Sequence, residues 1–309
     1  MAKFLISGLI NIETTLKVES FPIPYRPVDY PFFGIESGVS GVGYNIAKAF
    51  TRLGNQTRLL SLVGQDLAAK QVYEALLVDH IPSNFVLSRI AQTAQSVILF
   101  DQEGCSQIHV DLKNIQEQSY PVHHFEQAMA ASDLLVLCNI NFSRPFLPKS
   151  IKAGKVIATD VHAIADLEDD YNRDFMESAS ILFMSDELLP VEPVEWAKAV
   201  MERYAPEILV IGLGEQGALL AVRSDDFMQS FPSVQVRPVV NTIGAGDALF
   251  SAFLHIYTRT RNPYEAIEKA IVYAAYKVGA SSASAGLLTS QKLERVFTES
   301  KASPSEGTT

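Results

Sequence analysis

The segment NTIGAGD, residues 241–247, joins a β-like run at residues 234–240 to a helix-like apolar pattern at residues 248–257. Two glycines let the backbone of this turn approach a ligand closely, and the first N–H groups of a helix lack intrahelical partners. Such N–H groups stabilise a phosphate or an oxyanion. The predicted anion hole is formed by the backbone of Gly244, Ala245, Gly246 and Asp247. Asp247 would meet a hydroxyl beside the phosphate; the alternative is an ordinary helix-start carboxylate after a glycine-rich turn.

A second glycine-rich segment, SGVGYNIA at residues 40–47, precedes a helical pattern that reaches Leu53. The two segments resemble, in the same order, the two signatures of the ribokinase (PfkB) family of carbohydrate and nucleoside kinases. The carboxy-terminal signature is met throughout residues 241–254, whereas Ser40 replaces the first glycine of the amino-terminal one. Residues 8–13, GLINIE, resemble the family's first strand and its Asn-x-Asp sugar-binding pair, with glutamate for aspartate. The resemblance extends over nearly the whole chain.

The order of apolar segments predicts an α/β protein. Strand-like runs alternate with helical patterns in both halves of the chain, as in a parallel sheet covered by helices. Between the two halves, a hairpin is predicted around a turn at residues 101–104. The resemblance implies a ribokinase-like three-layer α/β/α core with a mostly parallel sheet plus a small β lid. The predicted organisation is one kinase domain over residues 1–299, with lid strands from about residues 12–33 and 93–113, and a disordered tail at residues 300–309.

The resemblance also implies where an ATP-dependent phosphotransferase of this family would bind its ligands. Asp247 would accept the proton of a primary hydroxyl, while backbone N–H groups stabilise charge on the γ-phosphoryl group. The implied sugar-binding residues are Asn11, Glu13, Gly41 and Asn45. The implied nucleotide-binding residues are Ser185, Gly212, Gly214 and Gly217. As alternatives, Asn45 could be a helix cap, Asn11 a turn residue and Glu13 a structural residue.

Residues 212–217, GLGEQG, match the dinucleotide-binding fingerprint letter for letter. That fingerprint requires a helix next, but residues 218–222 are uniformly apolar and end at a polar run at residues 223–226. A hairpin with a glycine turn fits this pattern better. In the ribokinase-like family the same place corresponds to the Thr-x-Gly-x-x-Gly turn beside the nucleotide, with Gly212 here in place of threonine.

Two departures from the family pattern concern cations. The family's Asn-x-x-Glu motif, associated with magnesium and phosphate, corresponds here to residues 185–188, so that Leu188 replaces the glutamate. Asn241 stands where aspartate is more frequent. Asp186, Glu187 and Asn241 are therefore weak metal-ligand candidates, and the first two could instead simply favour a helix N-terminus. The implied cofactors are ATP and Mg²⁺, with a monovalent cation as a further option.

The amino-acid composition limits the classes of binding partner and the cellular compartment that we expect for this protein. Of the 309 residues, 48% are hydrophobic and 19% are charged, which is enough apolar material for a large core. The net charge of −10 and the absence of a Lys/Arg cluster argue against nucleic-acid and anionic-membrane surfaces. No apolar run approaches the roughly 20 residues of a membrane span, and two cysteines make no disulfide framework. We expect a cytoplasmic protein with a small-molecule substrate, and the resemblance adds a homodimer formed through the lid.

Three functions follow from these patterns. The first is an ATP-dependent kinase of a ribose- or fructose-like sugar, or of a nucleoside. The second is a non-catalytic regulatory relative that binds a sugar or a nucleotide, because Ser185, Leu188 and Gly212 depart from the family pattern. The third is a kinase of a phosphorylated sugar. That function needs a cationic clamp, and the lid segments offer only Lys17, Arg26 and Lys113.

Overall fold

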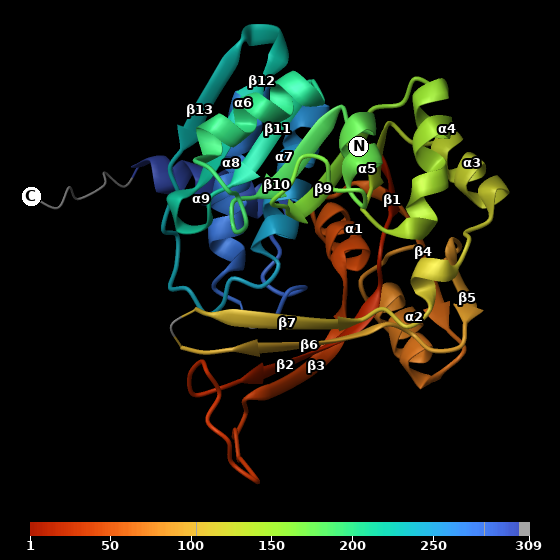
Figure 1. Ribbon diagram of the computed structural model, residues 1–309, viewed down its shortest axis with the longest axis vertical. Coiled ribbons are helices and arrows are strands. Elements are labelled where there is room, and N and C mark those ends of the chain that lie inside the picture. The colour runs from red at the N-terminus through yellow and green to blue at the C-terminus, as the bar shows by residue number, and fades with distance from the viewer. Residues whose placement is uncertain (103, 281, 303–309) are drawn as a thin grey trace, which may run out of the picture.

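The computed structural model describes residues 1–102, 104–280 and 282–302, which contain two β-sheets (Figure 1). The larger sheet has nine strands in the order β13-β12-β11-β10-β9-β8-β1-β4-β5, and the smaller has four in the order β3-β2-β6-β7. The strands are β1 Lys3–Ser7, β2 Asn11–Lys17, β3 Ile35–Ser40, β4 Gln56–Gly64, β5 Val86–Ile90, β6 Gln95–Phe100, β7 Ser106–Asp111, β8 Leu134–Leu137, β9 Ile157–Ala163, β10 Ile181–Ser185, β11 Ile208–Gly212, β12 Ala218–Val222 and β13 Phe227–Phe231.

The helices lie between these strands and after them. The α-helices are α1 Val42–Arg52, α2 Leu67–Val78, α3 Val122–Ala130, α4 Leu147–Lys152, α5 Arg173–Ser178, α6 Pro193–Arg203, α7 Ala245–Thr260, α8 Pro263–Lys277 and α9 Ser290–Ala302. Short 3-10 turns are η1 Ile115–Glu117, η2 Asn141–Phe146, η3 Gly214–Gln216 and η4 Arg223–Asp225.

Helices cover both faces of the nine-stranded sheet, as the predicted three-layer α/β/α core requires. Successive residues of β1 point to opposite faces, so that Phe4 and Ile6 join one apolar core and Leu5 joins the other. The first core contains side chains of α1, α2, α7, α8 and α9, and the second contains those of α3, α4, α5 and α6. Seven neighbouring strands of this sheet, β11, β10, β9, β8, β1, β4 and β5, are parallel, and β12 and β13 add an antiparallel edge.

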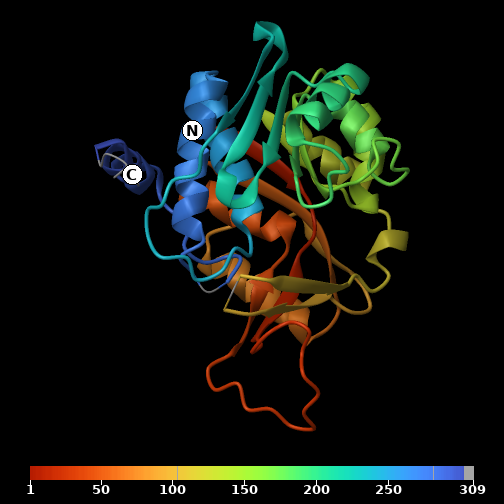
Figure 2. The same cartoon turned by 60° about the vertical axis from the view of Figure 1, so that its left-hand side comes forward.

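The smaller sheet corresponds to the predicted lid. Strands β6 and β7 form the hairpin expected from the sequence, and β2 joins them in parallel to β6 and antiparallel to β3. Figures 1 and 2 show this sheet standing apart from the nine-stranded sheet, with the loop between β2 and β3 extending furthest. The predicted lid range of residues 12–33 is wrong at its end, because β3 begins at Ile35. Most β3 residues are exposed, so no apolar alternation marks this strand in the sequence.

The predicted strand at residues 234–240 is also wrong, because the chain there belongs to no sheet. Pro232 and Pro238 lack the N–H groups that a ladder of hydrogen bonds needs. The N–H of Val240 instead donates to the carbonyl oxygen of Val278, directly after α8, at 2.8 Å. The segment before the glycine-rich turn is therefore fixed by the end of a helix and not by a neighbouring strand.

The carboxy-terminal end of the chain differs from the prediction as well. Helix α9 continues to Ala302, so the predicted disordered tail starts too early at residue 300, and residues 303–309 lie outside the described residues. Within the described part of the chain, no helix has both the length and the apolar character needed to cross a bilayer.

Helix α1 packs directly on the end of β1 through two glycines. A Cβ atom added to Gly43 would lie 2.6 Å from the carbonyl carbon of Gly8, and one added to Gly8 would lie 2.7 Å from Sγ of Cys138. These distances are shorter than van der Waals contact, so the approach of the helix to the strand requires residues without side chains at both positions.

Gly43→Ala is expected to lower the free energy of unfolding by roughly 1–3 kcal/mol, because the backbone must move to admit the methyl group. Gly38→Ala in β3 is the matched control, since an added Cβ there meets nothing within 4 Å. Equilibrium unfolding in urea measures both values. Equal stability of the two variants would show that the helix and the strand separate without cost.

Candidate active site

The parallel strands of the large sheet end at one common edge, and in such sheets ligands bind outside the carboxyl ends of the strands. Cys138 follows β8 at this edge and is buried. Burial raises the pKa of the Cys138 thiol, and the negative charges of Asp247 and Asp160 raise it further. Asp247, in the first turn of α7, therefore lies beside the ends of β8 and β9.

Asp247 receives a hydrogen bond from a residue 202 positions earlier in the chain. Nδ2 of Asn45, in α1, donates to Oδ2 of Asp247 at 2.8 Å. Burial raises the pKa of Asp247 to about 6, the charges of Asp160 and Glu13 raise it too, and the Asn45 hydrogen bond and the His162 charge lower it. The carboxylate form dominates above this pH, so at neutral pH Asp247 can accept a proton. Asn45 is not the helix cap considered as an alternative, since α1 begins at Val42.

Ser40 links the Asn45–Asp247 pair to the lid. Its Oγ lies 2.9 Å from Oε2 of Glu13, to which it donates, and 3.3 Å from Oδ1 of Asn45. Burial raises the pKa of Glu13, while the Ser40 hydrogen bond and the positive charge of Lys277 lower it. The four polar side chains thus form one continuous line from β2 to α7. The sequence marked Ser40 only as a departure from the family pattern, whereas the structure places it inside the site.

Asn11 and Gly41 lie at the start of the same line. Nδ2 of Asn11 donates to Oγ of Ser96 in β6 at 2.8 Å, and its buried Oδ1 has no hydrogen-bond partner among the described residues. A substrate hydroxyl could donate to that oxygen. Gly41 has φ +102, and an added Cβ would lie 3.0 Å from the same Oδ1 and 2.7 Å from the Leu9 carbonyl oxygen. Glycine is therefore required there for the local backbone and for access to Asn11.

The N–H groups of the glycine-rich turn differ in their hydrogen bonding, although the sequence predicted that all of residues 244–247 would form the anion hole. Gly244 adopts the left-handed region, with φ +77, and an added Cβ would lie 2.8 Å from the Ala283 carbonyl oxygen. The N–H of Ala245 donates to Thr242 at 3.0 Å, which removes it from the predicted anion hole. The N–H groups of Gly246 and Asp247 have no backbone acceptor among the described residues. The space where a Gly246 side chain would project is open, as a closely approaching ligand would need.

The predicted nucleotide-binding residues are brought together at the ends of β10 and β11. Ser185 and Gly212 are register partners, and the N–H of Asp186 donates to the Gly212 carbonyl oxygen at 3.0 Å. Strand β12 returns antiparallel after η3, which confirms the predicted hairpin and excludes the strand–helix unit of a dinucleotide site. Gly217 has φ +105 and is required by the hairpin itself.

The metal-ligand candidates do not converge. Among the described residues, no group of three or more His, Cys, Asp or Glu could hold a metal ion. Burial raises the pKa of the half-buried Asp186, Glu187 is exposed, and Oδ1 of Asn241 accepts the Ile243 N–H at 3.1 Å. Asp186, Glu187 and Asn241 therefore do not assemble a magnesium site, and a magnesium ion here would be carried mainly by nucleotide phosphates and water. Leu188 is 57% exposed, so it is not a core residue.

The sequence did not single out two residues at the end of β9. His162 has φ +59, its N–H donates to Oδ1 of Asp160 at 2.8 Å, and its Nδ1 lies 3.8 Å from the same oxygen. The charges of both residues act on Asp247. The sequence did contain a signal for these two residues. Asp160 and His162 are polar residues at the carboxyl end of an otherwise mostly apolar strand.

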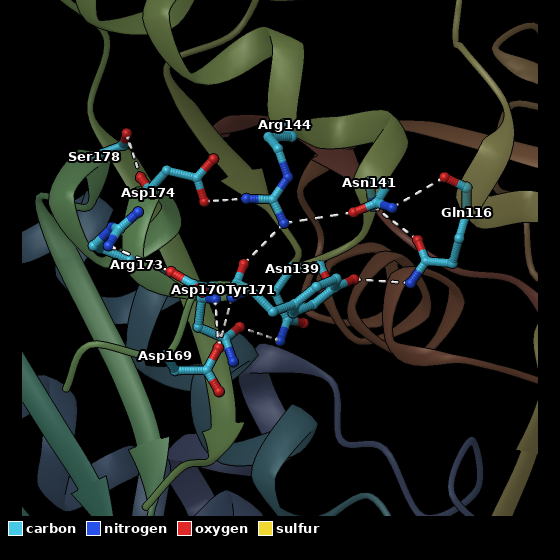
Figure 3. A network of polar contacts seen from close by, with 11 residues as sticks. Gln116, Asn139, Asn141, Arg144, Asp169, Asp170, Tyr171, Arg173, Asp174 and Ser178 are labelled. Atoms are coloured by element: carbon cyan, nitrogen blue, oxygen red, sulfur yellow. Dashed lines mark hydrogen bonds and ion pairs between the residues drawn. The ribbon is translucent and has the colours of Figure 1, made fainter. Parts of the chain in front are cut away.

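A polar network fixes the loop that follows β8 (Figure 3). Arg144 of η2 pairs with Asp174 of α5 and donates to the Tyr171 carbonyl oxygen at 2.8 Å. The Tyr171 hydroxyl donates in turn to the carbonyl oxygen of Asn139 at 2.7 Å. Asn139 directly follows Cys138, so this network holds the backbone at the carboxyl end of β8 in place.

Comparison with known proteins shows which family the chain belongs to. The pfkB family carbohydrate kinase model matches residues 1–290. The deoxyribokinase of Salmonella typhimurium is 25% identical over 288 residues, covering 88% of this chain and 91% of the relative. The fructosamine kinase FrlD of Bacillus subtilis is 24% identical over 247 residues, covering 77% and 83%.

Solved structures of other proteins share the fold, and two of them illustrate it. The microbiome-derived acarbose kinase Mak1 has a TM-score of 0.85 at 23% identity, and the Arabidopsis thaliana ribokinase complexed with ribose and ATP has 0.78 at 18%. Each comparison covers 96% of this chain and 99% of the other. The two signatures, the sheet order and the family match lead to one conclusion: the chain belongs to the pfkB family of carbohydrate kinases.

Proposed function

We propose that this kinase transfers the γ-phosphoryl group of ATP to a primary hydroxyl of a ribose- or fructose-like sugar, with Asp247 as the base. The observation that carries the proposal is the 2.8 Å hydrogen bond between Asn45 and Asp247. It joins the sugar-binding signature to the phosphate-binding signature, so that both substrates would meet at one carboxylate. The deoxyribokinase and fructosamine kinase relatives support a sugar as the acceptor.

In this proposal Asp247 orients the sugar hydroxyl and accepts its proton as the phosphoryl group is transferred. The N–H groups of Gly246 and Asp247 stabilise negative charge on the transferred group. Magnesium bound to ATP neutralises further charge on the phosphates. Ser185 and the turn at residues 212–217 hold the nucleotide, and the lid excludes water from the reacting atoms.

A coupled assay of ADP release over sugars and nucleosides, with magnesium, tests the acceptor class. Turnover of a pentose or hexose is the expected result. Turnover of nucleosides alone would replace the sugar proposal by a nucleoside kinase, a function consistent with a fold shared with nucleoside kinases. Binding of ADP without turnover of any acceptor would favour a regulatory protein.

Asp247→Asn is expected to lower kcat by about 10²-fold or more while ADP binding persists, because the amide keeps the shape but cannot accept the proton. The pKa of Asp247 near 6 adds a second expectation. Since the active form is deprotonated, wild-type kcat/KM should fall about tenfold per unit as the pH drops below 6. A variant with wild-type turnover, or a rate that rises below pH 6, would exclude Asp247 as the base.

Ser40→Ala is expected to raise the KM for the sugar about tenfold or more, with little change in the KM for ATP. The reason is that Glu13 loses a hydrogen bond to a charged group, which contributes roughly 1.5–3 kcal/mol. Ser37→Ala on the same strand is the matched control, because the Ser37 hydroxyl shares its hydrogen bond with Thr14 on the exposed side of the sheet. Steady-state kinetics in both substrates separates the effects, and equal changes in the two KM values would assign Ser40 a purely structural role.

We also propose that the lid pairs with the lid of a second copy. The loop between β2 and β3 exposes the large apolar side chains of Tyr25, Tyr30, Phe32 and Phe33. Exposed apolar patches of this kind mark protein interfaces. Light scattering after gel filtration should give a dimer for the wild type and a monomer after Phe32→Ser together with Phe33→Ser. A monomeric wild type would end this proposal.

A further inference from the structure

Lys277, the last residue of α8, is buried with 0% of its surface exposed. Its ammonium group donates to the carbonyl oxygen of Ile243, the residue that precedes the left-handed Gly244 of the glycine-rich turn. Among the described residues, this carbonyl is its hydrogen-bond acceptor, and no carboxylate lies within ion-pair distance. A buried lysine without a carboxylate partner is rare because its desolvation is not compensated.

The same helix contains a second buried lysine, and ion pairs compensate the burial of its charge. Lys269 lies two turns earlier, and its ammonium group pairs with Glu265 at 2.8 Å and with Glu294 at 2.7 Å. By contrast, burial lowers the pKa of Lys277 to about 8, the negative charges of Asp247 and Glu13 raise it, and the charge of Arg237 lowers it. The charge of Lys277 is therefore coupled to the candidate active site and not to a structural ion pair.

The contact with Ile243 determines how one peptide unit of the turn is oriented. In a trans peptide the carbonyl oxygen and the next N–H point in opposite directions. Because the Ile243 oxygen faces Lys277, the N–H of Gly244 faces away from α8. The Asn241 side chain and the backbone after Lys277 hold the preceding residues: Asn241 Oδ1 accepts the Ile243 N–H at 3.1 Å, and the Val278 oxygen accepts the Val240 N–H at 2.8 Å.

A backbone carbonyl beside an anion site is also a typical ligand for a monovalent cation, since both potassium and an ammonium group bind such oxygens. The sequence left a monovalent cation open as a cofactor. In the structure, the Lys277 ammonium group already occupies that carbonyl. Unlike a bound ion, the ammonium group of a lysine is part of the chain and does not dissociate when the ionic composition of the solution changes.

We infer that Lys277 is a positioning residue that supplies a built-in cation beneath the turn at residues 241–247, so that phosphate binding and turnover require no potassium or sodium. The inference rests on the proposed kinase function for its kinetic readout. Lys277 keeps the Gly244 N–H directed away from α8 and places one positive charge near the phosphoryl group and Asp247.

The first test compares rates in potassium, sodium and choline chloride at equal ionic strength. Wild-type kcat and KM for ATP should be the same in the three salts. Lys277→Met, which has a similar length without the charge, should lower kcat by about 10²-fold. Potassium or ammonium, but not choline, should restore part of this loss, because a small free cation can bind the vacated carbonyl.

Lys269→Met is the matched control. It should lower the melting temperature and leave kcat unchanged in every salt, because it breaks an ion pair remote from the turn. A Lys277→Met variant with wild-type kcat, or with a loss that no small cation restores, would overturn the inference. Stimulation of the wild type by potassium would also overturn it, and that measurement does not depend on the folding of any variant.

Calorimetric titration with ADP separates this inference from the kinase proposal. Wild-type affinity for ADP should be equal in potassium and choline, whereas Lys277→Met should bind ADP roughly tenfold more weakly in choline and regain affinity in potassium. If no acceptor is phosphorylated, the kinase proposal fails, but the titration still decides whether Lys277 replaces a cation. Equal ADP affinity of both proteins in both salts would show that it does not.

Discussion

The hydrogen bond from Asn45 to Asp247 joins helices α1 and α7, which belong to distant parts of the chain but pack on the same face of the large sheet. Both helices begin at the edge where the parallel strands end. Burial at this edge would favour a protonated Asp247, and the Asn45 amide favours the carboxylate. The balance places the pKa of Asp247 near 6, which leaves a proton acceptor at neutral pH. If the two helices separated, neither Asp247, the proposed base, nor Asn45 would remain in place.

Close packing by glycines makes this convergence possible. Gly8 and Gly43 bring α1 onto the end of β1, and Gly244 lets the turn before α7 lie against Ala283. Each contact would be broken by a single methyl group. The site is therefore assembled from backbone contacts first, and its polar side chains are then positioned by the helices and strands that carry them.

The charges at the candidate active site must be considered separately from the net charge of the protein, because the site combines carboxylates with positively charged groups. The chain has a net charge of −10, and the carboxylates of Glu13 and Asp160 act on Asp247. An anionic ligand could not approach three carboxylates without compensation. The helix N-terminus of α7 and the buried Lys277 provide positive potential at the same place. The departures from the family pattern also have a physical role here, since Ser40 binds Glu13 and Asn241 holds the turn.

The sequence alone determined the features that depend on local patterns. Apolar alternation located most strands and helices, and the hairpin signal located β6 and β7. Two glycine-rich segments pointed to the family and marked Asp247 as the candidate base. Tertiary structure decided what depends on long-range contacts. The run at 234–240 has the composition of a strand but belongs to no sheet, because Pro238 cannot donate and the Val240 N–H donates to Val278 directly after α8. Lys277 looks like an ordinary helix lysine in the sequence, and only the structure shows that it is buried and contacts the Ile243 carbonyl oxygen. Periodicity records which face of an element is apolar, but it carries no information about which distant residue that face will meet.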